Sequence, residues 1–299
     1  MSMTPELEIR ELEKSDKDEV VEMTSGIWDG RDYIPDYFDR WVEDGGFICG
    51  TVDGEIVALA KHTWHSDDIL WLEGLRVHPD HREKGYGRAM IEGQVDYINE
   101  HLDYRVARFL TSNDNTPVKK VVEDIGFELK QKYDYVRLDD EDLEEMEPPM
   151  DNEIDNVRLE KEVDDVVDMV LSSKELKDNK GLYMEHWTAY PMNEELVRDR
   201  VENGYCYSVR DEDSGEIDAL MFMQVHDLYE SLSVTFACGS HGGMRELFRY
   251  SLKYCLEEGY ERLRLKSASD NVIEAAKEEG FSHSDHHSCT LVYEYEKDQ

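Results

Sequence analysis

The sequence predicts an α+β protein with two similar domains, each containing a mixed, mostly antiparallel central sheet flanked by helices. Three observations support this prediction. The chain has 299 residues, which is enough for two hydrophobic cores. The order of strands and helices expected in the first half recurs in the second. The two endings also match, because TPVKKVVEDIGFELKQ parallels DNVIEAAKEEGFSHSD, and each predicts a helix that ends before Gly-Phe.

The elements of the first half follow from apolar residues that alternate in strands and recur every three or four residues in helices. Asp53-Gly54 marks a hairpin turn, and Gly126 ends a helix. In chain order we expect a strand at 7–12, helices at 16–27 and 37–43, a hairpin of 46–52 and 55–64, a strand at 69–77, a helix at 85–100, a strand at 105–111, a helix at 116–124 and the last strands within 127–138.

The second half gives the same kinds of pattern in the same order. A hairpin turn is expected at Asp213-Ser214-Gly215. Around it we expect a strand at 157–159, helices at 163–171 and 193–202, a strand at 231–237, a helix at 244–257, a strand at 262–266, a helix at 272–278 and a strand at 289–295.

The boundary between the two domains is predicted in the acidic stretch LDDEDLEEMEPPMDNEID, which spans residues 138–155. Its Pro-Pro pair and its low content of apolar residues indicate a linker. We therefore expect a first domain at 1–140, a linker at 141–153 and a second domain at 154–299.

The charge is strongly negative, since 71 acidic residues against 33 basic ones give a formal net charge of −38. The acidic residues are spread along the whole chain, which favours a halophilic-type surface in a salt-rich cytoplasm. The alternative is a surface that attracts a polycationic acceptor. Nucleic acid is disfavoured as a partner because there is no basic stripe. Scattered cysteines without a CxxC pair and the lack of a long apolar run predict a soluble, cytoplasmic protein with reduced thiols.

The segment LEGLRVHPDHREKGYGRAM, residues 72–90, carries the strongest functional signal. A predicted strand ends at Val77, and a glycine-containing turn then leads into a helix. Helix N-termini attract anions, and glycines without a β-carbon allow close approach of a ligand. Cations are disfavoured at that end of a helix, yet Arg82, Lys84 and Arg88 cluster there. The pattern predicts a bound anion such as a pyrophosphate, against the alternative of an ordinary helix start with exposed basic residues.

The motif Arg82-x-x-Gly85-x-Gly87, together with Asn115 eleven residues before Gly126, resembles the coenzyme A signature of the GNAT acetyltransferases. The resemblance covers most of residues 5–138 and implies acetyl-CoA as co-substrate and no metal. It also implies that the pyrophosphate and the pantetheine arm are bound by Leu75, Val77, Arg82, Glu83, Lys84, Gly85, Tyr86, Gly87, Arg88 and Asn115.

The resemblance implies acetyl transfer from a thioester to an amine, which requires a base, and Glu73 in an otherwise apolar strand is the candidate. The alternative is that Glu73 faces solvent or pairs with a cation. Many GNAT enzymes have a tyrosine as general acid four residues before the Gly of Gly-Phe, but this chain has Val122 there. Three residues are possible substitutes: Tyr133, Tyr135 and His65.

Residues 26–35, GIWDGRDYIP, lie where GNAT enzymes commonly contact the acceptor, and they resemble the histidine N-acetyltransferase group. The alternative is a solvated loop whose aromatic residues fill the core. The resemblance implies a free amino acid or small amine as acceptor, with peptide or protein N-acetylation and acetyl-CoA sensing without catalysis as alternatives. The expected acceptor-binding residues are Trp28, Asp29, Arg31, Tyr33 and Arg76, with Asp32 as an alternative to Asp29.

The second domain departs from the motif, since Phe236 corresponds to Arg82 and Ser269 to Asn115. We expect it to be a non-catalytic, degenerate copy that helps to wall the acceptor site. A histidine-rich patch formed by His283, His286, His287 and Cys289 fits no structural zinc pattern, so we expect no metal there. The protein is expected to be a monomer or homodimer without nucleic-acid or membrane partners.

Overall fold

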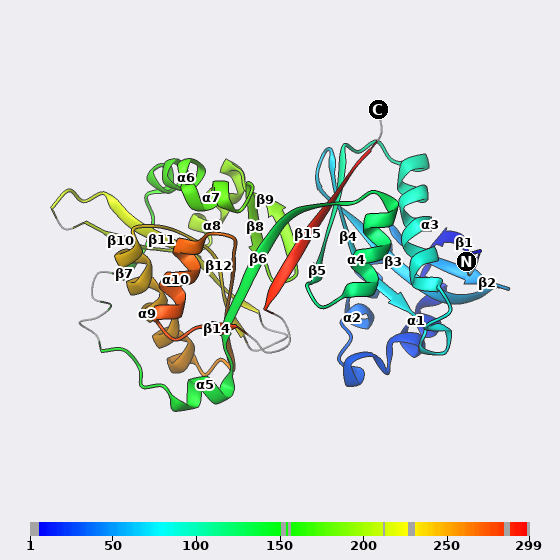
Figure 1. Cartoon of the computed structure of the whole chain (residues 1–299), viewed down its shortest axis with the longest axis horizontal. Coiled ribbons are helices and arrows are strands. Elements are labelled where there is room, and N and C mark those ends of the chain that lie inside the picture. Colours follow the sequence, from blue (N-terminus) through cyan, green and yellow to red (C-terminus); the bar gives the residue numbers. More distant parts are fainter. Residues whose placement is uncertain are drawn as a thin grey trace. The chain divides into compact units, whose positions relative to one another are not determined.

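Two units divide the chain between them, and neither is continuous in sequence (Figure 1). The computed structural model describes residues 6–150, 154, 157–211, 213–226, 231–283 and 288–297. The first unit contains Met1–Phe109, Asn115–Glu128 and Tyr293–Gln299, and the second contains Leu110–Asp114 and Leu129–Val292. These units are groups of segments in contact and not consecutive parts of the sequence. The domain boundaries at 140 and 154 therefore stay a prediction.

The first unit is built on a mixed sheet. Its first four strands are antiparallel neighbours in chain order, and the fourth is parallel to the fifth. This confirms the predicted mixed, mostly antiparallel sheet. The strands are β1 (Glu8–Glu11), β2 (Phe47–Val52), β3 (Glu55–Ser66), β4 (Ile69–Val77) and β5 (Val106–Ser112).

Helices cover both faces of this sheet. Phe47 and Cys49 pack with the core residues of α1 (Lys17–Thr24) and α2 (Ile34–Asp44). Ile48, whose side chain points to the opposite face, packs with Met90 of a third helix. The remaining elements are the 3₁₀ turns η1 (Lys14–Asp16), η2 (Ile27–Gly30) and η3 (Pro79–His81) and the helices α3 (Tyr86–His101) and α4 (Thr116–Ile125).

The end of the chain completes the first unit. Strand β15 (Cys289–Glu296) reaches it with its second half. There the Lys297 amide donates to the Arg105 carbonyl at 3.0 Å. The Tyr293 ring stacks on Phe109 with centroids 5.5 Å apart. A segment more than 180 residues away in the sequence thus lies beside β5.

The second unit repeats the strand order of the first. Three antiparallel pairs of strands are followed by a parallel pair. The second strand of that parallel pair, β13 (Arg262–Ser267), also pairs antiparallel with β6 (Glu128–Leu138). This arrangement supports the predicted repeat of one fold. The strands, in spatial order, are β7 (Val157–Leu159), β10 (Cys206–Arg210), β11 (Ile217–His226), β12 (Ser231–Gly239) and β13 (Arg262–Ser267), and the short β14 (Ser282–His283) also pairs with β6.

Two groups of helices form separate hydrophobic clusters with this second sheet. One cluster includes Met244 and Leu247, and the other includes Val166 and Val197. A small hairpin forms a two-stranded sheet of its own. The helices of the first cluster are α9 (His241–Glu258) and α10 (Asp270–Glu278). Those of the second are α6 (Val163–Ser172), α7 (Lys174–Asp178) and α8 (Glu194–Glu202). The hairpin consists of β8 (Leu182–Glu185) and β9 (Thr188–Pro191).

The predicted elements are confirmed to within a few residues, with three differences. Residues 128–138 form one long strand rather than several. The predicted linker contains the helix α5 (Asp140–Glu145), whose Leu143 is buried in the core of the second unit. Three short features were not predicted, namely α7, the β8–β9 hairpin and β14. All five cysteines lie in the described part of the chain, where each is buried and has a free thiol.

Candidate active site

Strands β4 and β5 pair over a short distance only. Their parallel register runs from Ile69 opposite Val106 to Trp71 opposite Arg108. Strand β4 continues to Val77, and there its register is with β3 alone. The edge of β4 that includes Leu75 and Val77 therefore leaves β5, which makes backbone groups of β4 available to a ligand, as the sequence prediction requires.

Gly74 interrupts β4 at this point. The register between β3 and β4 shifts between Leu59 and Lys61, and Gly74 has a φ of +68°. A β-carbon at Gly74 would lie 2.9 Å from Cζ3 of Trp41. The bulge therefore requires glycine for both its backbone conformation and its space. Sequence analysis did not single out Gly74, although an isolated glycine in an apolar strand is the signal for a bulge.

Glu73 lies beside this bulge in a half-buried position. The Thr63 hydroxyl donates to Glu73 Oε1 at 2.8 Å. Burial raises the pKa of Glu73 above its usual value, and this outweighs the opposing effects of the Thr63 hydrogen bond and of the Lys61 and Arg40 charges. A carboxylate whose pKa is raised and which is held by one hydrogen bond is a stronger base than an exposed carboxylate and is suited to accept a proton.

The predicted anion-binding turn follows β4. Glu83 has a φ of +60° and Gly85 a φ of +91°, and α3 begins directly after Gly85. No side chain of the described residues caps this helix start, and its first turn contains no acidic residue. The first N–H groups of α3 are thus available to an external acceptor.

The three basic side chains of this turn already have partners. Lys84 Nζ donates to the Asp80 carbonyl at 2.7 Å, and Arg82 Nε donates to the Val77 carbonyl at 3.4 Å. Arg88 forms ion pairs with Glu92 at 2.7 Å and with Asp124 at 2.9 Å. These groups are more than a third exposed, so an incoming anion competes with weak pairs only.

Two positions that the sequence analysis considered belong to the helix α4 and its start. Asn115 precedes α4, and its carbonyl accepts from the Lys119 amide at 3.1 Å. Val122, at the position where many GNAT enzymes have a tyrosine, is buried in the same helix. Its side chain offers no proton.

The three alternative proton donors differ in their surroundings. The Tyr133 hydroxyl is buried and donates to the Asn179 carbonyl at 2.6 Å, which argues against a role in proton transfer. Tyr135 lies in the second unit, close to Lys266. His65 stacks on Trp71 with centroids 5.3 Å apart, within the first unit.

The candidate acceptor segment meets β4 through Arg76. The Arg76 guanidinium binds both carboxylate oxygens of Asp32, at 2.7 and 3.0 Å. It also lies 4.4 Å from the centroid of the Trp28 ring and 5.1 Å from that of Tyr33. The structure therefore brings together four of the candidates. Arg31 is exposed and donates to the Trp28 carbonyl at 3.4 Å, and the side chain of Asp29 lies outside the described part.

This arrangement changes the role expected for Arg76 and Asp32. We expected one of them to hold a substrate carboxylate or ammonium, but their side chains, which are 10% and 1% exposed, bind each other. The pair fixes the segment to β4 and orients the aromatic rings. Trp28 itself has a φ of +49° and is 56% exposed. A strained and exposed tryptophan in such a place is typical of a ligand-binding surface.

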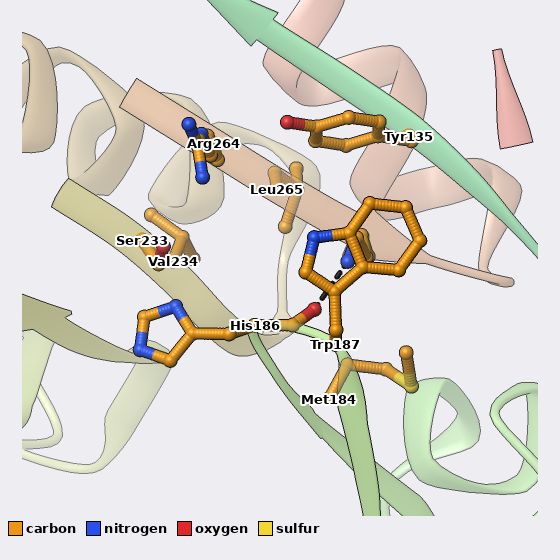
Figure 2. A pocket seen from close by; sticks show the side chains of 9 residues that line it. Tyr135, Met184, His186, Trp187, Ser233, Val234, Arg264 and Leu265 are labelled. Carbon is orange, nitrogen blue, oxygen red and sulfur yellow. Dashed lines mark hydrogen bonds between the residues drawn. The ribbon is translucent and has the colours of Figure 1, made fainter. Parts of the chain in front are cut away.

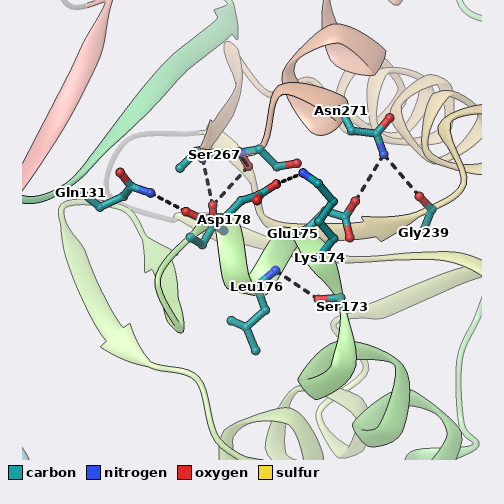
Figure 3. Close-up of polar contacts among 12 residues, drawn as sticks. Gln131, Ser173, Lys174, Glu175, Leu176, Asp178, Gly239, Ser267 and Asn271 are labelled. Atoms are coloured by element: carbon teal, nitrogen blue, oxygen red, sulfur yellow. Dashed lines mark hydrogen bonds and ion pairs between the residues drawn. The ribbon is translucent and has the colours of Figure 1, made fainter.

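The equivalent place in the second unit is closed by the chain's own polar groups, and Figure 3 shows those around Asn271. At the start of α9, Ser240 Oγ accepts from the Gly243 amide at 3.0 Å and donates to Asp218 at 2.5 Å. Asn271 donates to Glu175 at 3.3 Å and to the Gly239 carbonyl at 3.5 Å. A capped helix start with a carboxylate nearby is unfavourable for a pyrophosphate.

Two general features remain. Within the described ranges, no helix has both the length and the apolar character needed to cross a membrane. Among the residues that the structure describes, no group of three or more His, Cys, Asp or Glu side chains is arranged to hold a metal ion. His286 and His287 of the predicted histidine-rich patch lie outside the described residues.

Part of the sequence is similar to known acetyltransferases. Residues 8–127 match the family described as the acetyltransferase (GNAT) family. Histidine N-acetyltransferase from Oreochromis niloticus is 29% identical over 105 residues. The match covers 34% of this chain and 31% of that protein, so the chain matches about a third of the relative's length.

Comparison with solved structures covers nearly the whole chain. A GCN5-related N-acetyltransferase from Sphaerobacter thermophilus has a TM-score of 0.64 at 13% identity, over 99% of this chain and 98% of that chain. A tandem GNAT protein from the clavulanic acid biosynthesis pathway has a TM-score of 0.63 at 13% identity, over 98% and 99%. The chain therefore has the mixed α/β GNAT fold, and its residues 8–127 match the acetyltransferase (GNAT) family.

Proposed function

We propose that the protein transfers the acetyl group of acetyl-CoA to the primary amine of a free amino acid or another small amine. The observation that carries this proposal is the position of Glu73, whose pKa burial raises. It lies where β4 leaves β5, on the strand that leads into the uncapped start of α3. A base, an exposed strand edge and an anion site thus follow one another along a single segment.

The residues of the turn fit the diphosphate of coenzyme A. The N–H groups from Arg82 to Arg88 would bind it, and Gly85 and Gly87 have no β-carbon to keep it away. Leu75, Val77 and Asn115 would bind the pantetheine arm. Acetyl-CoA supplies an acetyl group that is activated as a thioester, and the remaining chemistry belongs to the protein.

The protein's main task is to remove a proton from the acceptor. An α-amine with a pKa near 8 is about 10% neutral at pH 7. The Glu73 carboxylate would take the proton from the remaining ammonium, directly or through one water, as the nitrogen attacks the thioester carbonyl. The C–N bond then forms, the C–S bond breaks, and coenzyme A leaves as a thiolate. Its Oε1 is held by Thr63, so the carboxylate keeps a fixed orientation during this step.

Replacing Glu73 with Gln is expected to slow acetyl transfer about 100-fold at pH 6.5 and much less at pH 9. The amide cannot accept a proton, so only acceptor that is already neutral reacts, and its fraction falls about tenfold per pH unit below the amine pKa. The measurements are the pH–rate profile and the Kd for acetyl-CoA, which should not change.

Thr63→Val is the companion variant. It removes the hydrogen bond that lowers the pKa of Glu73. The acid limb of the profile should therefore move to higher pH while the maximal rate is retained. An identical profile for wild type and Glu73→Gln would show that Glu73 is not the base.

The acceptor class is inferred from the segment around Trp28 and Tyr33 and from the matched stretch of histidine N-acetyltransferases. Release of the coenzyme A thiol with a panel of free amino acids, small amines and peptides tests it. Turnover with free amino acids supports the proposal, and turnover with peptides alone contradicts it. Tight acetyl-CoA binding without turnover would indicate a sensor, a second candidate favoured by the apolar Val122.

Asp32→Asn is expected to raise the KM for the acceptor about tenfold, which corresponds to ~1.4 kcal/mol. The change weakens the pair with Arg76 and loosens the rings of Trp28 and Tyr33. Asp36→Asn, at an exposed position of α2, is the control. The Kd for acetyl-CoA should be unchanged in both variants. An increase of that Kd in Asp32→Asn, without any change of KM, would place the pair at the cofactor instead.

A further inference from the structure

A small pocket in the second unit lies where the β8–β9 hairpin meets β12 and β13 (Figure 2). Its volume is ≈ 20 Å³, which is room for a single small polar group, since one water needs roughly 10–15 Å³. Arg264 and Lys266 project into it from β13, where alternate residues share one face. The proposed acetyl transfer uses none of these residues.

The two cations of this pocket have no carboxylate partner among the described residues. Arg264 Nε is buried and has no hydrogen-bond acceptor in the described part of the chain. Lys266 Nζ donates to the carbonyl of His186 and lies over two aromatic rings, at 4.2 Å from the centroid of Trp187 and 5.2 Å from that of Tyr135. In a chain with a net charge of −38, two cations that line one pocket without a carboxylate partner among the described residues indicate a missing anion.

The hairpin tip that covers the pocket is strained. His186 and Trp187 form the two-residue turn between β8 and β9, and His186 has a φ of +51°. Glycine and asparagine are the residues that such turns prefer. The unfavourable turn directs the His186 carbonyl to Lys266 and places the half-exposed Trp187 beside it (Figure 2). Strain that is retained at a pocket is typical of a binding site.

We propose that this pocket binds the carboxylate of a small organic acid, with Arg264 and Lys266 as donors and Trp187 covering the carbon chain. A guanidinium and an ammonium together match the two oxygens of a planar carboxylate. The pocket volume favours this flat group over a tetrahedral phosphate. Burial and the Arg264 charge also lower the pKa of Lys266 to about 7, which is the effect that a bound anion would reverse.

The test measures acetate binding to the full chain in the absence of acetyl-CoA, by calorimetry in a buffer free of carboxylates. We expect one acetate per chain, and at least tenfold weaker binding in both Arg264→Gln and Lys266→Met. Arg262→Gln is the matched control, because Arg262 lies on the same strand but does not line the pocket and pairs with Asp139 at 3.5 Å. Its affinity for acetate should equal that of the wild type.

Three outcomes would overturn the proposal: no acetate binding by the wild type, equal or tighter binding of inorganic phosphate, or unchanged acetate affinity in Lys266→Met. The comparison of acetate with phosphate needs no variant, so a misfolded Arg264→Gln protein does not prevent the test. Because acetyl-CoA is absent, the result is independent of acetyl transfer. If the protein binds acetate in this pocket but transfers no acetyl group, the proposed function is contradicted and the proposed carboxylate site is not.

Discussion

Glu294→Gln is expected to lower the free energy of unfolding by about 3–5 kcal/mol. Arg108 Nε lies 2.6 Å from Glu294 Oε2, and the two side chains are only 8% and 9% exposed. Glutamine has nearly the same shape but no charge, so the guanidinium of Arg108 stays buried beside a neutral amide. Removing one member of a buried ion pair costs more than the pair contributes, because the other charge keeps its desolvation penalty.

Urea denaturation measures this effect, and the m-value should stay constant. Glu296→Gln is the control, since Glu296 lies on the same strand and is exposed. That variant should change stability by less than about 0.5 kcal/mol. Replacing both Arg108 and Glu294 with Leu should recover most of the loss. If Glu294→Gln lowers the free energy of unfolding by less than about 1 kcal/mol, the pair of Arg108 with Glu294 does not stabilise the first unit.

The sequence predicted the features that depend on local chemistry. The glycines of Arg82–Gly87 predicted a turn, and the residues after them predicted a helix. The observed turn and helix α3 begin and end within a few residues of the predicted positions. The mostly apolar stretch at 69–77 was predicted as a strand, and the bounds of β4 agree with it to the residue. The acidic run at 140–145 was expected to bury little, but it forms the helix α5, and its Leu143 is buried in the core of the second unit.

The features that sequence analysis missed depend on residues far apart in the chain. Alternation over 289–295 predicted a strand but gave no information on its neighbour, so the pair of Arg108 with Glu294 could not be foreseen. The mutual binding of Arg76 and Asp32 is of the same kind, since either side chain alone suggests a ligand contact. The β8–β9 hairpin was missed because His186-Trp187 is an unfavourable turn sequence.

Gly87→Glu is expected to weaken acetyl-CoA binding about 100-fold, which corresponds to roughly 2.7 kcal/mol, without destabilising the protein. Gly87 is the second residue of α3, and a β-carbon there would meet only Val77 Cγ2 at an ordinary 3.6 Å. Replacing glycine in a helix gains about 0.5–1 kcal/mol, and an acidic residue in the first turn adds about 0.3–1 kcal/mol. The same carboxylate would repel a diphosphate bound at this helix start.

Gly242→Glu is a matched control, because Gly242 is the second residue of α9 and a β-carbon there has open space. This variant should gain similar stability and keep the wild-type affinity for acetyl-CoA. The two measurements are thermal unfolding and titration with acetyl-CoA. Opposite effects on stability and affinity in Gly87→Glu, with no change of affinity in Gly242→Glu, would assign the diphosphate to the start of α3. Equal affinity in both variants and the wild type would exclude that helix start as the cofactor site, and with it the basis for acetyl transfer in the first unit.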